Sequence, residues 1–270
     1  MIEARDTQAE GGTGGRDFWP DDKPRRSGKP KSKLLLGVAA VLVAVVLAAV
    51  AFVVLSGGDD GDKKDAAGTS NGPGVLPSAY TPQMADKAMV KLAQRTADPR
   101  PVTQGEAFPA DARNVKYRTY AFTLAASEVA GDCKAVTWGQ RLHGDLAKHG
   151  CTQVVRGSYV SQDQRSLGQV AVFNMADQDG AEQIVRLIDP STNAGFVLPL
   201  NAKGRPAFGK GFSAAYAQVY GHYVVLTWVQ RAGGGQPASL NEMIDTSLAI
   251  EKPADFVWGR VDMVPTRKQQ

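Results

Sequence analysis

The sequence predicts a membrane-anchored protein with one exported α+β domain, in which helices cover one face of a mainly antiparallel sheet. Three observations lead to this prediction. An uninterrupted apolar run covers Leu34–Leu55. Residues 82–264 have the composition of an ordinary globular domain that is long enough for one hydrophobic core. Within that domain, helical and strand-like patterns follow one another in the order α-β-α-β-β-α-β-β-α.

The apolar run Leu34–Leu55 contains no charged residue and no proline. At about 1.5 Å per residue, a helix of this length extends about 33 Å, and a bilayer core is about 30 Å thick. The run is apolar on all sides, so it lacks the polar face that a surface helix requires. A buried core helix is the alternative, but such helices are rarely so long. We therefore expect a transmembrane helix.

The charges beside this run indicate its orientation. The residues before it include Lys23, Arg25, Arg26, Lys29, Lys31 and Lys33, and those after it include Asp59, Asp60, Asp62 and Asp65. Lys and Arg are retained on the cytoplasmic side, which places the N-terminus inside and the C-terminal domain outside. A cleavable signal peptide is the alternative, but its apolar region is usually about 7–15 residues long. The sequence therefore favours an uncleaved signal anchor.

Polar segments flank the helix and the domain. Residues 1–33 have two aromatic side chains, Phe18 and Trp19, and are expected to be a disordered cytoplasmic tail. The basic half of this tail is expected to contact anionic lipid headgroups, with a docking motif around Asp17–Pro20 as the alternative. Residues 56–81 are rich in Gly, Asp, Ser and Pro and predict a flexible linker. Residues 265–270 form a polar tail.

The first half of the domain contains two predicted helices and one predicted strand. Thr81 and Pro82 are a typical N-cap and first-turn pair, and they predict a helix that ends at Asp98–Pro101. Aromatic residues favour a strand over Val115–Leu124. A further helix is predicted within Val136–Lys148, with Gly150 as its C′ residue.

The second half contains clearer patterns. The predicted elements are strands Thr152–Val160 and Leu167–Asn174, helix Asp177–Leu187, a hairpin of Ser213–Tyr220 and His222–Gln230 around Gly221, and helix Ser239–Ile250. Asp177 is expected to cap its helix. The middle β-α-β-β-α-β order predicts a ferredoxin-like core, to which a hairpin and a helix are added.

The two cysteines, Cys133 and Cys151, both lie in the domain. An even pair in an oxidising compartment predicts a disulfide. The two Cα atoms must then lie within about 7 Å, whereas a full helix between them would separate them by about 20 Å. The bridge therefore requires a short helix and a segment 133–137 that folds back beside it. Two buried free thiols are the alternative.

The stretch Cys133…Gly150-Cys151-Thr152-Gln153 resembles a group of actinobacterial membrane-anchored proteins. These proteins combine a basic tail and one transmembrane helix with an exported domain that carries this cysteine pattern. The resemblance covers mainly the middle of the domain. It implies the location and the cysteine pair, and it implies no activity.

No pattern in the sequence predicts a metal site or a cofactor. The three histidines are His143, His149 and His222. His143 and His149 are six residues apart, so on one helix they point in different directions, and neither belongs to an HExxH motif. Surface imidazoles are the expected interpretation.

Three other motifs only partly match catalytic patterns. Gly211–Ala215 has one glycine too few for G-x-S-x-G and precedes a strand rather than a helix. Gly204–Gly211 imitates a phosphate-binding loop but ends in Gly where Ser or Thr should bind Mg²⁺. The acids Asp163, Asp177, Asp179 and Glu182 are close in sequence, but a turn and a helix start explain them better than glycan cleavage does.

Charge gives no support for nucleic-acid binding. The net charge of +4 includes the basic residues beside the apolar run, and the domain lacks a stripe of basic and aromatic residues. Arg113, Lys116 and Arg118 are expected to form a modest basic edge that would suit an anionic envelope polymer, and a solvated sheet face explains these residues equally well.

Two functional hypotheses remain. The first is a non-enzymatic module that binds an envelope protein or polymer while it is tethered to the bilayer. The second is an envelope hydrolase or transferase whose active site the sequence does not reveal. The absence of a complete catalytic motif favours the binding module.

Overall fold

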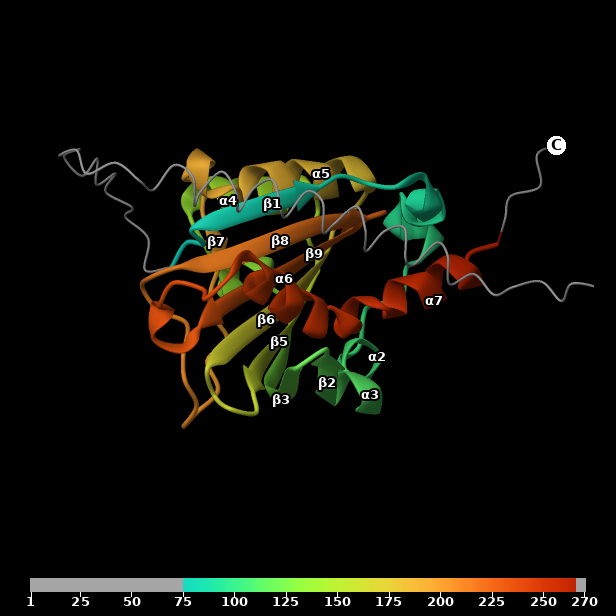
Figure 1. Cartoon of the computed structure of the whole chain (residues 1–270). Coiled ribbons are helices and arrows are strands. Elements are labelled where there is room, and N and C mark those ends of the chain that lie inside the picture. Colours follow the sequence, from blue (N-terminus) through green and yellow to red (C-terminus); the bar gives the residue numbers. More distant parts are fainter. Residues whose placement is uncertain (1–74, 266–270) are drawn as a thin grey trace, which may run out of the picture. The chain divides into compact units, whose positions relative to one another are not determined.

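A seven-stranded sheet runs through the part of the chain that the computed structural model describes, residues 75–265 (Figure 1). In spatial order its strands are β1 (Ala79–Gln83), β8 (Ser213–Tyr220), β9 (Tyr223–Arg231), β6 (Ser166–Asn174), β5 (Gln153–Ser161), β3 (Tyr120–Ala130) and β2 (Asn114–Tyr117). β1 is parallel to β8, and every other neighbouring pair is antiparallel. The predicted α+β class with a mainly antiparallel sheet is confirmed.

Helices cover both faces of this sheet, so the prediction of helices on one face is wrong. The α-helices are α4 (Gln140–Lys148) and α5 (Gln178–Leu187) on one face, and α2 (Gln104–Ala107), α3 (Ala110–Arg113), α6 (Leu240–Ala249) and α7 (Phe256–Met263) on the other. Alternate residues of β9 show the reason: Val224 packs in the cluster under α5, and Val225 packs in the cluster under α6. Two-sided burial makes a strand continuously apolar rather than alternating.

Short 3-10 helices and a small second sheet connect these elements. The 3-10 helices are η1 (Lys87–Leu92), η2 (Arg95–Ala97), η3 (Cys133–Val136), η4 (Pro190–Thr192), η5 (Ala232–Gly234) and η6 (Lys252–Ala254). The second sheet pairs β4 (Thr137–Trp138) with β7 (Phe196–Val197).

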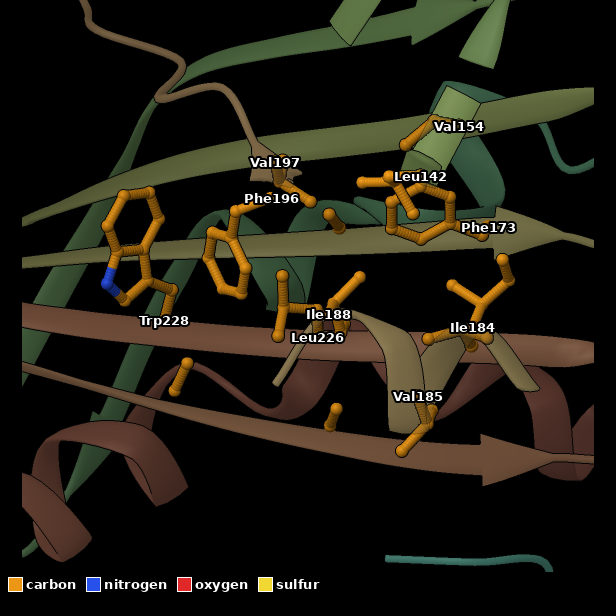
Figure 2. Close-up of a cluster of buried hydrophobic side chains, with 14 of the residues drawn as sticks. Leu142, Val154, Phe173, Ile184, Val185, Ile188, Phe196, Val197, Leu226 and Trp228 are labelled. Carbon is orange, nitrogen blue, oxygen red and sulfur yellow. The ribbon is translucent and has the colours of Figure 1, made fainter. Parts of the chain in front are cut away.

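The core under α4 and α5 includes Trp228, which is fully buried and lies at one end of the cluster drawn in Figure 2. The Phe196 ring meets the Trp228 ring edge-on, with 5.3 Å between their centroids. The Phe208 ring lies 4.4 Å from the Trp228 ring and comes from the long loop before β8. Aromatic pairs at such distances add about 0.5–1.5 kcal/mol beyond the burial of their area.

The strand order is not that of a ferredoxin-like fold. β3, β5 and β6 are sequential antiparallel neighbours, so α4 connects two adjacent antiparallel strands instead of crossing over between parallel ones. One split unit is present: β6, α5 and β8, with β9 inserted between the two strands. β6 and β8 are parallel because each is antiparallel to β9.

The predicted first helix is also wrong, because Thr81 and Pro82 belong to strand β1. Proline has no N–H to donate, but an edge strand with one partner tolerates it, and β1 pairs with β8 alone. The folded domain therefore begins before Pro82, inside the predicted linker. The helical pattern survives as η1, whose first turn is capped by Asp86: its Oδ1 accepts from Ala88 N at 2.8 Å.

Two further differences concern the first predicted strand and the C-terminal segment. The predicted strand Val115–Leu124 is a hairpin of β2 and β3, turned at Arg118, whose φ is +52°. The sequence predicts no helix or strand after Ile250, whereas the structure has helix α7 there.

The remaining predicted elements agree closely with the structure. β5, β6, α5, β8 and β9 lie within one or two residues of their predicted bounds. Asp177 caps α5 as expected, with Oδ1 accepting from Gly180 N at 2.8 Å. Gly150 has a φ of +61° and ends α4, and Cys151 N donates to Leu146 O at 2.9 Å. This is the bond of a Schellman motif.

The predicted transmembrane segment Leu34–Leu55, the tail 1–33 and most of the predicted linker lie outside the described residues. Among residues 75–265, no helix has the length and apolar character needed to cross a bilayer.

Candidate functional site at the open edge of β3

The outer edge of β3 is open over most of its length. β2 pairs only with Tyr120–Thr123, and within residues 75–265 no strand pairs with the outer side of Leu124–Ala130. These seven positions are half-buried or exposed, whereas all of β6 and nearly all of β5 are buried. An open edge presents unpaired backbone N–H and C=O groups, to which another extended segment can bind.

A β-bulge interrupts β3 beside this edge. Leu124 pairs with Tyr159, and Ala126 pairs with the next residue, Ser158, so Ala125 is the extra residue. A bulge bends its strand and often lies at a sheet edge or beside a functional site. Here it lies between two pockets, and both are lined by Leu124 and Ala125.

The larger pocket has a volume of about 540 Å³, and we call it the basic pocket. Its lining comes from β3, from the end of β5 and from the loop before β8: Thr123, Leu124, Ala125, Val160, Ser161, Gln162, Ala202, Lys203 and Arg205. Lys203 and Arg205 are exposed. Within the described part of the chain, neither has a carboxylate within ion-pair distance, so both charges are available to a ligand.

Buried polar side chains of the sheet hold the first part of this loop. Gln169 Oε1 accepts from Leu200 N at 2.6 Å, and Gln169 Nε2 donates to Leu198 O at 3.2 Å. Arg156 Nη1 donates to the same Leu198 carbonyl at 2.6 Å. The Arg156 guanidinium is itself neutralised by Glu128 on β3. The path of the loop is therefore fixed by the sheet beneath it.

The far end of the loop is held in a similar way. Gln230 bonds both backbone groups of Gly209, accepting from N and donating to O, each at 2.9 Å. Phe208 lies against Trp228. The turn that carries Lys203 and Arg205 is thus held at both ends, and Gly204 in this turn has a φ of +73°.

A smaller pocket of about 230 Å³ lies on the opposite face of the same edge. It is lined by Gln104, Phe108, Arg113 and Ser127, besides Leu124, Ala125 and Ala126. Gln104 Nε2 donates to Ser127 Oγ at 2.5 Å. No His, Asp, Glu or Cys side chain lines either pocket among the described residues.

Asp163 lies in the turn next to the basic pocket, and its role is local. Its Oδ1 accepts from Ser161 Oγ at 2.6 Å and from Arg165 N at 3.1 Å. These two hydrogen bonds lower the pKa of the Asp163 carboxyl. The other acids that were weighed for glycan cleavage are at α5, where Asp177 is the cap and Glu182 pairs with Arg186.

The three histidines are not assembled into a site. His143 Nε2 is 3.2 Å from Thr137 O, and His149 Nε2 is 4.0 Å from Asp145 Oδ1. His222 is fully buried in the β8–β9 turn, where its Nδ1 lies 2.8 Å from Leu92 O. In residues 75–265, no three His, Cys, Asp or Glu side chains are placed to hold a metal ion.

The partly matching catalytic motifs are structural. Ser213 is completely buried, and its Oγ accepts from Trp228 Nε1 at 3.1 Å, so the hydroxyl is not accessible to a substrate. Gly204–Gly211 belongs to the loop and leads into strand β8 rather than a helix. The basic residues at 113–118 are also separated: Arg113 lines the smaller pocket, and Arg118 pairs with Asp245 at 3.4 Å.

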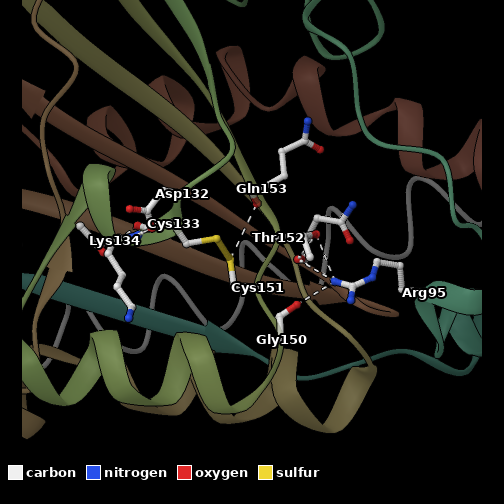
Figure 3. The surroundings of a disulfide bond; sticks show 10 residues. Arg95, Asp132, Cys133, Lys134, Gly150, Cys151, Thr152 and Gln153 are labelled. Atoms are coloured by element: carbon white, nitrogen blue, oxygen red, sulfur yellow. Dashed lines mark hydrogen bonds between the residues drawn. A yellow bond between two sulfur atoms is a disulfide. The ribbon is translucent and has the colours of Figure 1, made fainter.

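The predicted disulfide between Cys133 and Cys151 is present (Figure 3), with 6.3 Å between the Cα atoms. The geometry is the expected one, because α4 is short and the segment before it folds back. Gly139, with a φ of +102°, turns the chain between β4 and α4. Arg95 Nη1 donates to Gly150 O at 2.7 Å and fixes the turn beside Cys151.

A buried charge cluster around Arg260 of α7, which we call the Arg260 cluster, was not predicted from the sequence. Arg260 donates to Asp98 Oδ2 at 2.9 Å and to both carboxylate oxygens of Glu106, at 2.7 and 2.5 Å. The Tyr223 hydroxyl also donates to Asp98, at 2.9 Å. In the sequence, the one indication of this cluster is a single arginine within the otherwise apolar run Phe256–Val261. Arg260 joins α7 to Tyr223 of β9 and to Asp98 and Glu106, and neither pocket beside β3 includes these residues.

Comparison of the chain with protein-family models, with curated proteins and with solved structures finds no match. The interpretation of the site therefore rests on its own geometry.

Proposed function

We propose that this protein is a non-enzymatic binding module, held at the cell membrane by one helix at Leu34–Leu55, with a cytoplasmic N-terminus and an extracytoplasmic domain. In this proposal the helix and the basic residues before it contact the bilayer. The domain binds an envelope partner through the basic pocket and the open edge of β3. The apolar run, the charge asymmetry around it and the resemblance to actinobacterial anchored proteins support the location.

The observation that carries the binding role is the pair of unneutralised cations, Lys203 and Arg205, beside an unpaired strand edge. The loop that presents them is held by Gln169 and Gln230, so little ordering is required when a ligand binds. The pocket lining offers hydroxyl, amide and cationic groups, and it lacks the imidazole or carboxylate that acid–base catalysis uses most often. This composition suits recognition better than turnover.

The test is site-specific photo-crosslinking in intact cells that express the full chain. A photoreactive residue is placed at Lys203, and a control is placed at Val90 of η1, which is 68% exposed. A discrete adduct from position 203 but not from position 90 supports the proposal. The Arg205→Glu change, combined with the probe at 203, should remove that adduct and leave the melting temperature unchanged. Equal labelling from both positions would contradict the proposal.

A further inference from the structure

We infer that the partner binds as an added β-strand: an extended acidic peptide segment that pairs with the open edge of β3. This inference rests on the proposed function and specifies the chemistry of the ligand. Its first support is that the outer backbone groups of Leu124–Ala130 have no partner strand within the described residues. Strand addition to such an edge obtains affinity from main-chain hydrogen bonds.

The second support is the position of the two pockets. Phe108, which lines only the smaller pocket, packs in the core under α6, and Val160, which lines only the basic pocket, packs in the core under α5, so the two pockets lie on opposite faces of the sheet edge. Successive side chains of a strand point to opposite faces. An added strand would therefore direct alternate side chains toward the basic pocket and toward the smaller pocket. Alternating pockets are how such complexes obtain specificity.

The charges around the edge select an acidic segment. Lys203 and Arg205 line the basic pocket, and Arg113 lines the smaller one. β3 has one carboxylate in the open stretch, that of Glu128, and its charge is neutralised by Arg156. An acidic strand thus meets cations on both faces, and complementary charge favours the correct partner and faster association.

The bulge limits where pairing takes place. Because Ala125 disturbs the ladder, regular pairing is available over Ala126–Ala130, and Val129 on this stretch is 41% exposed. The basic pocket lies beyond the bulge, next to Thr123. The segment that fits therefore pairs over the short stretch Ala126–Ala130 and places an acidic side chain at the end that passes the bulge.

The test uses the full chain in lipid nanodiscs and a fluorescent peptide in which pairs of Val alternate with pairs of Glu, so that acidic side chains reach both faces; a Val–Lys peptide of the same pattern is the matched control. We expect the Val–Glu peptide to bind, and the K203E/R205E variant to bind it about tenfold more weakly or worse. Hydrogen exchange at residues 124–130 should slow when the peptide is bound. Two further peptides carry backbone N-methyl groups, one at the odd positions and one at the even positions. One of them should not bind and the other should bind normally, because only alternate N–H groups of an added strand face the edge of β3.

The outcomes separate this inference from the proposed function. Binding that needs Lys203 and Arg205, but leaves exchange at 124–130 unchanged and tolerates both N-methyl series, would retain the binding face and overturn strand addition. If hydrogen exchange at residues 124–130 slows with rising protein concentration and not with added peptide, the edge pairs with a second copy of the chain. This result would also overturn the addition of a peptide strand. Failure of the Val–Glu peptide to bind better than the Val–Lys peptide would overturn the acidic ligand class.

Discussion

Arg260 Nη1 of the last helix lies 2.9 Å from Asp98 Oδ2, and both side chains are almost completely buried, at 1% and 3% exposure. The two residues are 162 positions apart, so this pair joins the end of the domain to its beginning. Breaking a buried ion pair from one side leaves the other charge without compensation and costs about 3–5 kcal/mol.

We therefore expect Arg260→Met to lower the free energy of unfolding by about 3–5 kcal/mol in urea denaturation. The control is Arg100→Met, because Arg100 also pairs with Asp98, at 3.6 Å, but is 54% exposed. An exposed pair contributes about 1 kcal/mol or less. Equal losses in the two variants would show that burial does not set the energy of this cluster.

Removal of the disulfide tests a prediction that the sequence already supports. Cys133→Ala or Cys151→Ala should lower the free energy of unfolding by about 2–4 kcal/mol, because the bridge restricts the unfolded chain. The melting temperature of the domain should fall accordingly. Reductant should lower the wild-type value to the same level and leave both variants unchanged. Wild-type protein that is insensitive to reductant would argue against the bridge.

His222 should make stability depend on pH. Its burial lowers the pKa of the imidazole; Asp98 and the bond to Leu92 O raise this pKa, and Arg95 and Arg260 lower it further. The unfolded chain therefore binds the proton more readily than the folded one. Stability should be complete above the unfolded pKa of 6.5 and should be lost as the pH falls from there toward the lowered folded pKa.

Urea denaturation at pH 7.5 and pH 5 measures this effect. In the His222→Asn variant, the side-chain amide replaces the Nδ1 donor to Leu92 O and does not titrate. This variant should therefore lose a large part of the pH dependence between the two values. An unchanged slope in the variant would assign the effect to other groups.

Gly221 should not tolerate a side chain. Its φ is +61°, and a Cβ atom there would lie 2.3 Å from Leu92 O. Gly221→Ala should therefore destabilise the domain by about 1–3 kcal/mol, the usual cost of a strained backbone residue. Gly209→Ala is the control, because a Cβ there meets nothing within 4 Å. In thermal denaturation, Gly221→Ala should have a clearly lower melting temperature than Gly209→Ala. Equal melting temperatures would contradict this prediction.

Gln169 should control the order of the loop beside the basic pocket. Gln169→Leu removes the acceptor of Leu200 N, and an unpaired buried donor costs about 1–3 kcal/mol. Amide exchange at residues 198–205 should become faster, and crosslinking from position 203 should become less efficient. Unchanged exchange in this segment would show that Arg156 and Gln230 hold the loop without it.

The sequence predicted best those elements that local pattern determines. β5, β6, β8 and β9 are apolar runs of strand length bounded by turns, and Asp177 and Gly150 mark helix ends by their own chemistry. Thr81-Pro82 was misleading, because an N-cap and an edge strand can share the same two residues. The choice between them is made by the distant β8, to which β1 is paired.

The features that sequence analysis missed depend on distant contacts. In the sequence, β9 is only an apolar run, and this run does not show that both faces of the strand are buried. Helices on a second face of the sheet were therefore not predicted. The sequence predicts only a loop where the basic pocket lies. Gln169 and Gln230 hold this loop, but one lies on a strand before the loop and the other on a strand after it, so no local pattern links them to it. Arg260 finds its partners 154 and 162 positions earlier, and no local pattern indicates such a pair.

The disulfide also determines how the domain would respond to proteases. Cys133 and Cys151 enclose a segment with several exposed cleavage sites for trypsin-like enzymes, at Lys134, Arg141 and Lys148. A cut at any of them leaves both fragments covalently joined. Such a nicked molecule would migrate as an intact chain on a non-reducing gel and as two fragments after reduction. The domain would thus survive a cut between the two cysteines with β3 and β5 still joined by the disulfide.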